Sequence, residues 1–235
     1  MKLTRILRQT HQGVGLLVGI QVFLWISGGF VMSAFPLAKV RGEDYAAAGN
    51  TQPIDLQQEL ASPLTIAMDE GWESLDRSEL VMWSGQPVYR LATGDEILLA
   101  DARTGIKLSP LTEILALAVA EADYTGPGTA VKTSFQTEPE SEIRGRNLPL
   151  WRVDFDDSRS TAIYVSPQTG NVVARRNDIW RVYDFFWMLH IMDYGSRDDF
   201  NHPLLVAAAV FAWILATSGL WLVVTWLLRR RRRAR

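Results

Sequence analysis

The residues best suited to chemistry in this chain are its three histidines, His11, His190 and His202. A neutral imidazole binds haem iron through one ring nitrogen, while a hydrogen bond to the other nitrogen orients the ring. The chain has no cysteine, which excludes thiolate ligands, disulfides and thiol catalysis. It also has no phosphate-binding loop, dinucleotide-binding fingerprint or HExxH motif. The histidines are therefore the candidate cofactor ligands.

Two long segments without any charged residue contain or flank these histidines, and the structure of the segments decides where the histidines lie. They run from Gln9 to Ala38 and from Phe200 to Leu228. A helix of about 20 apolar residues crosses the hydrocarbon core, so we predict transmembrane helices at 12–35 and 203–228. The first segment also resembles a signal peptide, but its apolar stretch is too long for one, and we expect it to be retained.

The charges outside these segments predict the orientation. The two tails, residues 1–11 and 229–235, hold nine of the 24 basic residues and no acidic one. The remaining 15 basic residues face all 26 acidic ones, which gives the middle segment a net charge of −11. The positive-inside rule places both tails in the cytoplasm and residues 36–202 outside it. An acidic domain argues against nucleic acid as a partner, and we interpret the arginine tail as an anchor to the lipid bilayer rather than an RNA-binding segment.

The middle segment alternates between helical and strand-like patterns. Leucines and methionine four residues apart predict a helix from Ile54 to Met68, with Leu56, Leu60, Leu64 and Met68 on one face. Further along we predict strands at 79–83, 88–92, 97–101 and 161–165, and helices at 111–122 and 178–192.

Part of this pattern recurs. The sequence Gln86-Pro-Val-Tyr-Arg-Leu91 resembles Leu148-Pro-Leu-Trp-Arg-Val153. A second strand follows in each copy, then a turn at Thr104-Gly105 or Thr169-Gly170, and then a helix. We therefore predict an α+β domain of two hairpin-plus-helix repeats, at about 54–122 and 130–192, between two transmembrane helices.

Several motifs resemble the PepSY-associated transmembrane family. They are Leu7-Arg-Gln-Thr-His-Gln-Gly-Val-Gly-Leu16, Ser27-Gly-Gly29, Phe186-Trp-Met-Leu-His-Ile-Met-Asp-Tyr194, Phe200-Asn-His-Pro-Leu204 and Ser218-Gly219. The paired repeat around the two Thr-Gly turns is similar to the PepSY module itself. The resemblance covers most of the chain.

The resemblance implies a location in the bacterial inner membrane, with a periplasmic PepSY-like domain. Larger relatives have about four membrane helices and include reductases of ferric siderophores, in which paired histidines hold haem b. This chain has only two predicted spans, like a smaller ferric reductase of similar layout. It cannot build their helix bundle alone, so binding of one or two haems needs independent support or a dimer.

The surroundings of His11 allow two interpretations. Gly15 and Gly19 lie four and eight residues further along the same helix stripe. Such glycines permit the close approach of a flat macrocycle, with His11 as a ligand. They also permit the close approach of another helix, in which case His11 is an interfacial residue.

The two outer histidines have structural alternatives as well. His190 lies on a helix rich in aromatics (Trp180, Tyr183, Phe185, Phe186 and Trp187), which is also typical of an interfacial amphipathic helix. His202 precedes Pro203 and could cap the second transmembrane helix instead of binding haem.

Helix length restricts how these histidines can pair. About 35 Å separate His11 from the outer surface, so it cannot share an iron with His190 or His202 of the same chain. A homodimer would supply a second His11, while the outer pair could converge within or between chains. Ala208, Ala212 and Ala216 form a small-residue stripe that permits a close helix contact.

An acidic group, Asp193, Asp198 and Asp199, is a candidate for binding ferric iron, or else a solvated loop. The leading functional prediction is electron transfer across the membrane by haem b, with reduction of ferric iron or a ferric chelate by electrons from an unidentified donor. The alternatives are an anchored PepSY module that binds a partner without catalysis, and an accessory subunit of a redox complex.

Overall fold

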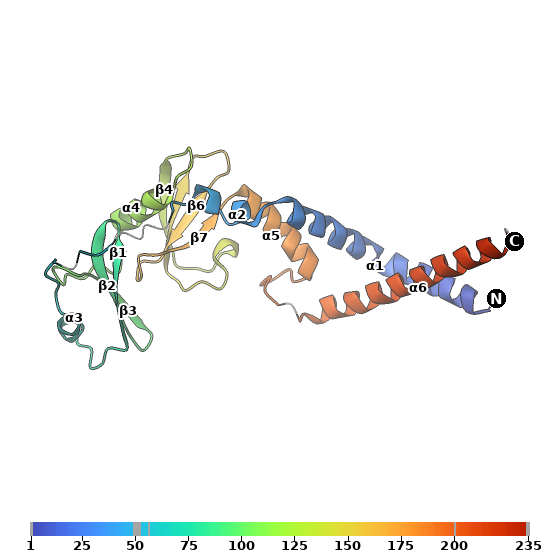
Figure 1. Ribbon diagram of the computed structural model, residues 1–235, viewed down its shortest axis with the longest axis horizontal. Coiled ribbons are helices and arrows are strands. Elements are labelled where there is room, and N and C mark those ends of the chain that lie inside the picture. The colour runs from blue at the N-terminus through green and yellow to red at the C-terminus, as the bar shows by residue number, and fades with distance from the viewer. Residues whose placement is uncertain (1, 49–52, 56, 200, 234–235) are drawn as a thin grey trace. The chain divides into compact units, whose positions relative to one another are not determined.

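The chain divides into two units in the computed structural model, which describes residues 2–48, 53–55, 57–199 and 201–233 (Figure 1). One unit contains residues 1–36 and 182–235, and the other contains residues 37–181. The boundary falls within one helix, α5 (Asp178–Ile191).

The first unit is built on two long helices, α1 (Lys2–Ala34) and α6 (Pro203–Arg233), which pack against each other. Each contains a 30-residue stretch that is long and apolar enough to cross a membrane, Arg5–Ala34 and Pro203–Arg232. Large apolar side chains on these helices are exposed, among them Leu16 at 88% and Trp213 at 69%. Side chains of this kind are stable when they face lipid. Both helices continue through the charged flanks that we had set apart as tails.

The second unit contains two antiparallel sheets, each covered by a helix. Its helical elements are α2 (Leu37–Val40), the 3-10 turns η1 (Glu43–Tyr45) and η2 (Ser141–Ile143), α3 (Pro63–Asp69) and α4 (Glu113–Asp123). The first sheet has the order β1 (Arg77–Trp83), β2 (Gln86–Thr93), β3 (Glu96–Asp101). The second has the order β4 (Ala130–Gln136), β5 (Leu150–Phe155), β6 (Ala162–Val165), β7 (Val172–Arg176). The predicted combination of helices and strands is confirmed.

Helix α3 is shorter than predicted. Ser62 caps its start by accepting a hydrogen bond from Thr65 N at 3.4 Å, and Pro63 occupies its first turn. Proline fits that position and not a helix interior, which is why the helix predicted from Ile54 begins only at Pro63. Leu56 lies outside the described residues. The predicted apolar face is also wrong in part, because Leu64 and Met68 are exposed while Ile66 packs on the first sheet.

The repeats are organised differently from the predicted hairpin followed by its helix. Helix α4, which follows the first sheet in the chain, packs against strands of the second sheet. Ile66 of α3 packs on Leu91 and Leu98 of the first sheet. Each sheet is therefore covered by the helix that precedes it, because tertiary packing and not sequence order decides which apolar faces meet.

The two Thr-Gly turns have the same backbone structure. Gly105 N donates to Asp101 O and Gly170 N donates to Ser166 O, each at 2.9 Å, and both glycines have positive φ. After the second turn the chain forms β7 beside β6, whereas after the first it makes a single bridge from Lys107 to Ala100. The two copies therefore share the same fold up to the turn. The strand that corresponds to β7 is reduced in the first copy to the single bridge at Lys107.

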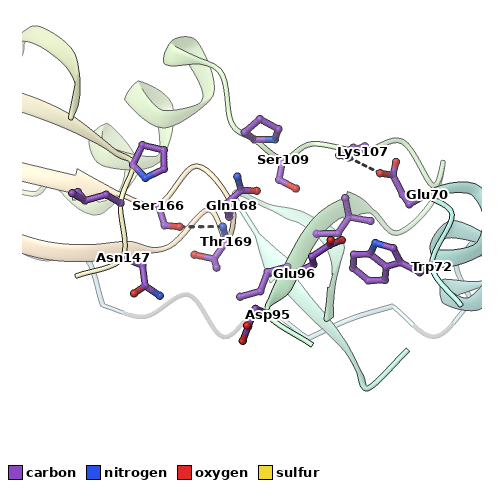
Figure 2. Close-up of a pocket in the computed structure, with 15 residues that line it drawn as sticks. Glu70, Trp72, Asp95, Glu96, Lys107, Ser109, Asn147, Ser166, Gln168 and Thr169 are labelled. Carbon is purple, nitrogen blue, oxygen red and sulfur yellow. Dashed lines mark hydrogen bonds and ion pairs between the residues drawn. The ribbon is translucent and has the colours of Figure 1, made fainter. Parts of the chain in front are cut away.

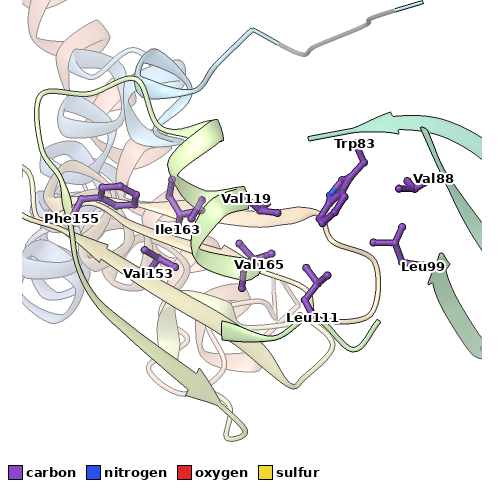
Figure 3. Close-up of a cluster of buried hydrophobic side chains, with 11 residues drawn as sticks. Trp83, Val88, Leu99, Leu111, Val119, Val153, Phe155, Ile163 and Val165 are labelled. Carbon is purple, nitrogen blue, oxygen red and sulfur yellow. The ribbon is translucent and has the colours of Figure 1, made fainter. Parts of the chain in front are cut away.

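A shared hydrophobic core joins the two sheets (Figure 3). Trp83, Val88 and Leu99 of the first sheet meet side chains of α4 and the second sheet, including Val119 and Val165. The indole of Trp83 also donates to the backbone oxygen of Gly170 at 2.9 Å.

The opposite face of the second sheet carries a partly buried ionic network centred on Glu142. This carboxylate accepts hydrogen bonds of 2.7 Å from Arg181 and from the Tyr164 hydroxyl. Burial by itself raises the pKa of Glu142, but these hydrogen bonds and the charges of Arg181 and Arg152 outweigh burial and lower it overall.

Candidate functional site

The imidazole of His11 is oriented by α6. Its Nδ1 lies 3.1 Å from the backbone oxygen of Leu215 and 3.0 Å from the hydroxyl oxygen of Ser218. A carbonyl oxygen can only accept a hydrogen bond, so Nδ1 carries the proton in the neutral ring. The lone pair is then on Nε2, which has no hydrogen bond among the described residues. This is the tautomer that a metal-ligating histidine needs.

A glycine on α6 makes room for this ring. A Cβ on Gly219 would lie only 2.9 Å from His11 Cε1. The two predicted close-approach glycines behave differently: a Cβ on Gly15 would meet Leu215 Cδ1 at 3.3 Å, whereas Gly19 has nothing within 4 Å. Gly15 therefore serves packing against α6, as the alternative interpretation held, and Gly19 borders open space.

An apolar groove of about 510 Å³ extends from His11 along α1 and α6. Its lining includes Trp25 on α1 and Ala212, Ala216 and Gly219 on α6. Two residues of the predicted small-residue stripe thus line the groove, while the third, Ala208, is buried.

His190 lies at the C-terminal end of α5, against the second half of α1. The side chains of Gln21 and Trp25 donate to the backbone oxygens of Leu189 and His190, at 3.0 and 2.7 Å. These are last-turn carbonyls that have no partner within their own helix. The polar residue Gln21, in the middle of an apolar span, therefore completes the hydrogen bonding of α5.

The His190 ring has one buried nitrogen without a partner. Its Nδ1 makes no hydrogen bond within the described part of the chain, and a Cβ on Gly28 would lie 3.8 Å from it. The ring also lies 6.3 Å from that of Trp25, centroid to centroid. The last turn of α5 thus packs on α1, while Val182 and Phe185 earlier in the same helix are exposed.

His202 caps the start of α6. Its Nδ1 accepts a hydrogen bond from Leu204 N at 3.3 Å. An accepting Nδ1 places the proton of the neutral ring on Nε2, which then has no lone pair for a metal. Coordination through Nε2 would require the ring to release this cap, so the geometry favours the capping interpretation.

Asp193 organises the loop between α5 and α6. It is 7% exposed and accepts four hydrogen bonds, from Ser196 Oγ at 2.7 Å and from the backbone N–H groups of Gly195, Asp198 and Asp199. The Ser196 hydroxyl, followed by these N–H groups, holds the pKa of Asp193 well below its usual range. The carboxylate is therefore occupied within the protein, whereas Asp198 and Asp199 are exposed.

A second acidic residue in the same unit is also paired. Asp184, on α5, is 5% exposed and is bridged to Arg197. The Arg197 backbone oxygen accepts a hydrogen bond from Trp187 Nε1 at 3.2 Å. This pair ties the loop to α5.

The histidines do not form one cluster. His190 packs beside Trp25, which is 14 residues beyond His11 and so about 21 Å further along α1. Within the described ranges, no three His, Cys, Asp or Glu residues gather as a metal-binding group. Sequence reasoning named Ser218 only within a motif, without assigning it a role, and did not single out Gln21. A polar side chain inside an apolar span is the signal that could have found both.

Comparison with known protein families gives a match. The family model described as the PepSY-associated TM region matches residues 8–235. No curated protein and no solved structure matches this chain.

Proposed function

Since the chain belongs to the PepSY-associated transmembrane family, we propose that it is a haem b protein that moves electrons across the membrane. On the outer side it reduces ferric iron or a ferric chelate, one electron at a time. Haem iron, when bound, supplies the change between Fe³⁺ and Fe²⁺ that this transfer requires.

The observation that carries the proposal is the position of His11 Nδ1 beside the Leu215 carbonyl and Ser218, from which the tautomer follows. Its Nδ1 proton is held by the Leu215 carbonyl and by Ser218, which leaves the Nε2 lone pair available beside an apolar groove. Ser218 and Gly219 act as positioning residues, since one orients the ring and the other gives it room.

The His11 of a second copy would hold the same haem together with the first His11. Two chains contribute four membrane helices, enough to enclose a cofactor, and the open groove beside Ala212 and Ala216 is the face on which they meet. A homodimer is therefore part of the proposal.

His190 is the ligand that we assign to the outer side. Its Nδ1 is a buried polar atom without a partner, beside the side-chain-free surface of Gly28. The two ring nitrogens diverge, so Nε2 points away from this contact. Trp25 lies between the proposed inner and outer haem ligands. Its ring is next to the His190 ring, and it also lines the groove beside His11.

The proposed topology follows from the charges. Both arginine- and lysine-bearing tails lie in the cytoplasm, and the PepSY-like unit lies in the periplasm of a bacterial inner membrane. The electron donor is then cytoplasmic or within the membrane.

The test is the visible spectrum of the full-length protein, purified in detergent from cells supplied with a haem precursor. We expect the reduced α-band of six-coordinate haem b in the wild type. His11→Ala should remove the inner haem and His190→Ala the outer one, whereas His202→Ala should keep the haem and lose stability. A wild-type spectrum without haem would refute the proposal and favour a non-catalytic, partner-binding PepSY module.

A further inference from the structure

A cavity of about 580 Å³ lies in the second unit (Figure 2). It lies between two modules: the first is the sheet β1–β3 with α3, and the second is the sheet β4–β7 with α4. The first module supplies Glu70 and Trp72 from the end of α3 and the turn that follows it. The second module supplies Asn147 and Ser166 on the other side (Figure 2). This volume falls within the range of pockets that hold small ligands.

The charges in the cavity do not balance. Its lining contains three carboxylates, of Glu70, Asp95 and Glu96, and one ammonium group, of Lys107. The ammonium group is already bonded to Glu70 at 2.5 Å. Asp95 and Glu96 have no ion-pair partner within the part of the chain that the structure describes. Both residues are exposed, and the lining as a whole carries two more negative than positive charges.

These two carboxylates stand on a fixed turn. Asp95 and Glu96 belong to the tight connection between β2 and β3, where Gly94 has positive φ. Gly94 N donates to Asp76 Oδ2 at 2.7 Å, which ties the turn to the segment before β1. The two charges therefore lie on an exposed turn that is hydrogen-bonded to a neighbouring segment.

The rest of the lining provides an aromatic surface and neutral polar groups. Trp72 lines the cavity, is partly exposed, and packs against the hydrophobic core of the first sheet. An indole ring attracts organic cations through its negative face. The side-chain amides of Asn147 and Gln168 add hydrogen-bonding groups on the opposite wall. Such a lining suits a molecule that has both a positive charge and an apolar carbon chain.

We propose that this cavity binds an organic cation, an amine or a guanidine, whose charge is neutralised by Asp95 and Glu96 and whose carbon chain packs on Trp72. A bare metal ion is a poor fit, because no three metal-ligating side chains gather within the described ranges. The cation comes either from a free polyamine or from a basic side chain of a peptide. The inference does not depend on haem.

Calorimetric titration of the full-length protein in detergent tests the proposal with three probes: spermidine, an N-acetylated lysine tripeptide amide and the matching glutamate tripeptide. We expect at least one cationic probe to bind and the glutamate peptide not to bind. Binding of spermidine alone identifies a free polyamine as the source, and binding of the tripeptide alone identifies a peptide. Higher salt should weaken the interaction.

Variants locate the binding. The double variant Asp95→Asn/Glu96→Gln should bind the cation about tenfold more weakly, and Trp72→Leu about threefold more weakly. Glu121→Gln removes an exposed charge on α4, outside the cavity, and should bind like the wild type. Failure of both cationic probes to bind at about 1 mM, equal binding of the acidic peptide, or unchanged affinity of the double variant would each overturn the proposal.

Discussion

Replacement of Gly219 by alanine is expected to displace the His11 imidazole without unfolding the helix pair. The added Cβ would lie 2.9 Å from His11 Cε1, whereas carbon atoms in contact are about 3.5 Å or more apart. The ring must therefore retreat by about 0.6 Å or more. A retreat of this size along the hydrogen bonds would stretch them from 3.1 and 3.0 Å to about 3.7 and 3.6 Å, beyond the range of a hydrogen bond.

The magnitude follows from the loss of these bonds. Hydrogen bonds between membrane helices contribute about 0.6–1.7 kcal/mol. If they hold His11 in its ligating position, their loss weakens haem binding by about 3- to 16-fold. Alanine is a better helix former than glycine, and the group that it meets is a rotatable side chain, so the melting temperature should change little.

Titration of the apoprotein with haem, followed at the Soret band, measures this affinity, and Gly19→Ala is the matched control because its Cβ meets nothing within 4 Å. The ¹⁵N spectrum of the imidazoles gives a readout that needs no haem, since the chain has only three histidines. We expect Gly219→Ala to disturb the Nδ1-protonated tautomer of His11. Equal haem affinity and an unchanged tautomer in Gly219→Ala, or an equal loss in Gly19→Ala, would refute the reasoning.

Three further predictions concern stability, measured as melting temperature in detergent. Asp184→Asn leaves the partly buried Arg197 without its anionic partner and should cost about 3 kcal/mol. Glu142 has a lowered pKa in the folded protein, so its stabilising contribution is present at neutral pH and is lost as pH falls through that pKa. Glu142→Gln should therefore reduce the fall in melting temperature between neutral and acidic pH, which we call the acid limb. Trp83→Ala empties the core between the two sheets and removes the hydrogen bond to Gly170, at a cost of about 3–5 kcal/mol.

Each of these has a control and a contradicting result. Asp198→Asn changes an exposed carboxylate in the same loop, and an equal loss in both variants would contradict the role of the Asp184 pair. Glu140→Gln removes a more exposed carboxylate near the same network, and an identical acid profile in Glu142→Gln and the wild type would show that Glu142 does not set the limb. Phe135→Ala truncates a half-exposed aromatic of β4, and Trp83→Ala should cost clearly more.

Local sequence signals predicted much of the architecture. The absence of charge over Gln9–Ala38 and Phe200–Leu228 is enough to predict two membrane helices, since only a helix satisfies its own backbone in lipid. The strands at 79–83 and 88–92 were predicted within two residues of β1 and β2, because alternation and turn residues act over short distances. The Thr-Gly turns were found from residue type, since their glycines have positive φ.

Tertiary structure decided which helix covers which sheet and what each histidine touches. His11 meets Leu215 and Ser218, more than 200 residues away in the chain, and no local pattern records such a contact. The sequence by itself determined that His11, His190 and His202 lie near the ends of apolar segments. The cap made by His202 is local, because its partner, Leu204 N, is two residues away. Only the packing of α1 against α5 and α6 distinguished a ring with a free Nε2 lone pair from a ring with an unpartnered buried nitrogen. Hydrogen-bond partners fix an imidazole tautomer, and the partners of His11 are brought together only when distant helices pack.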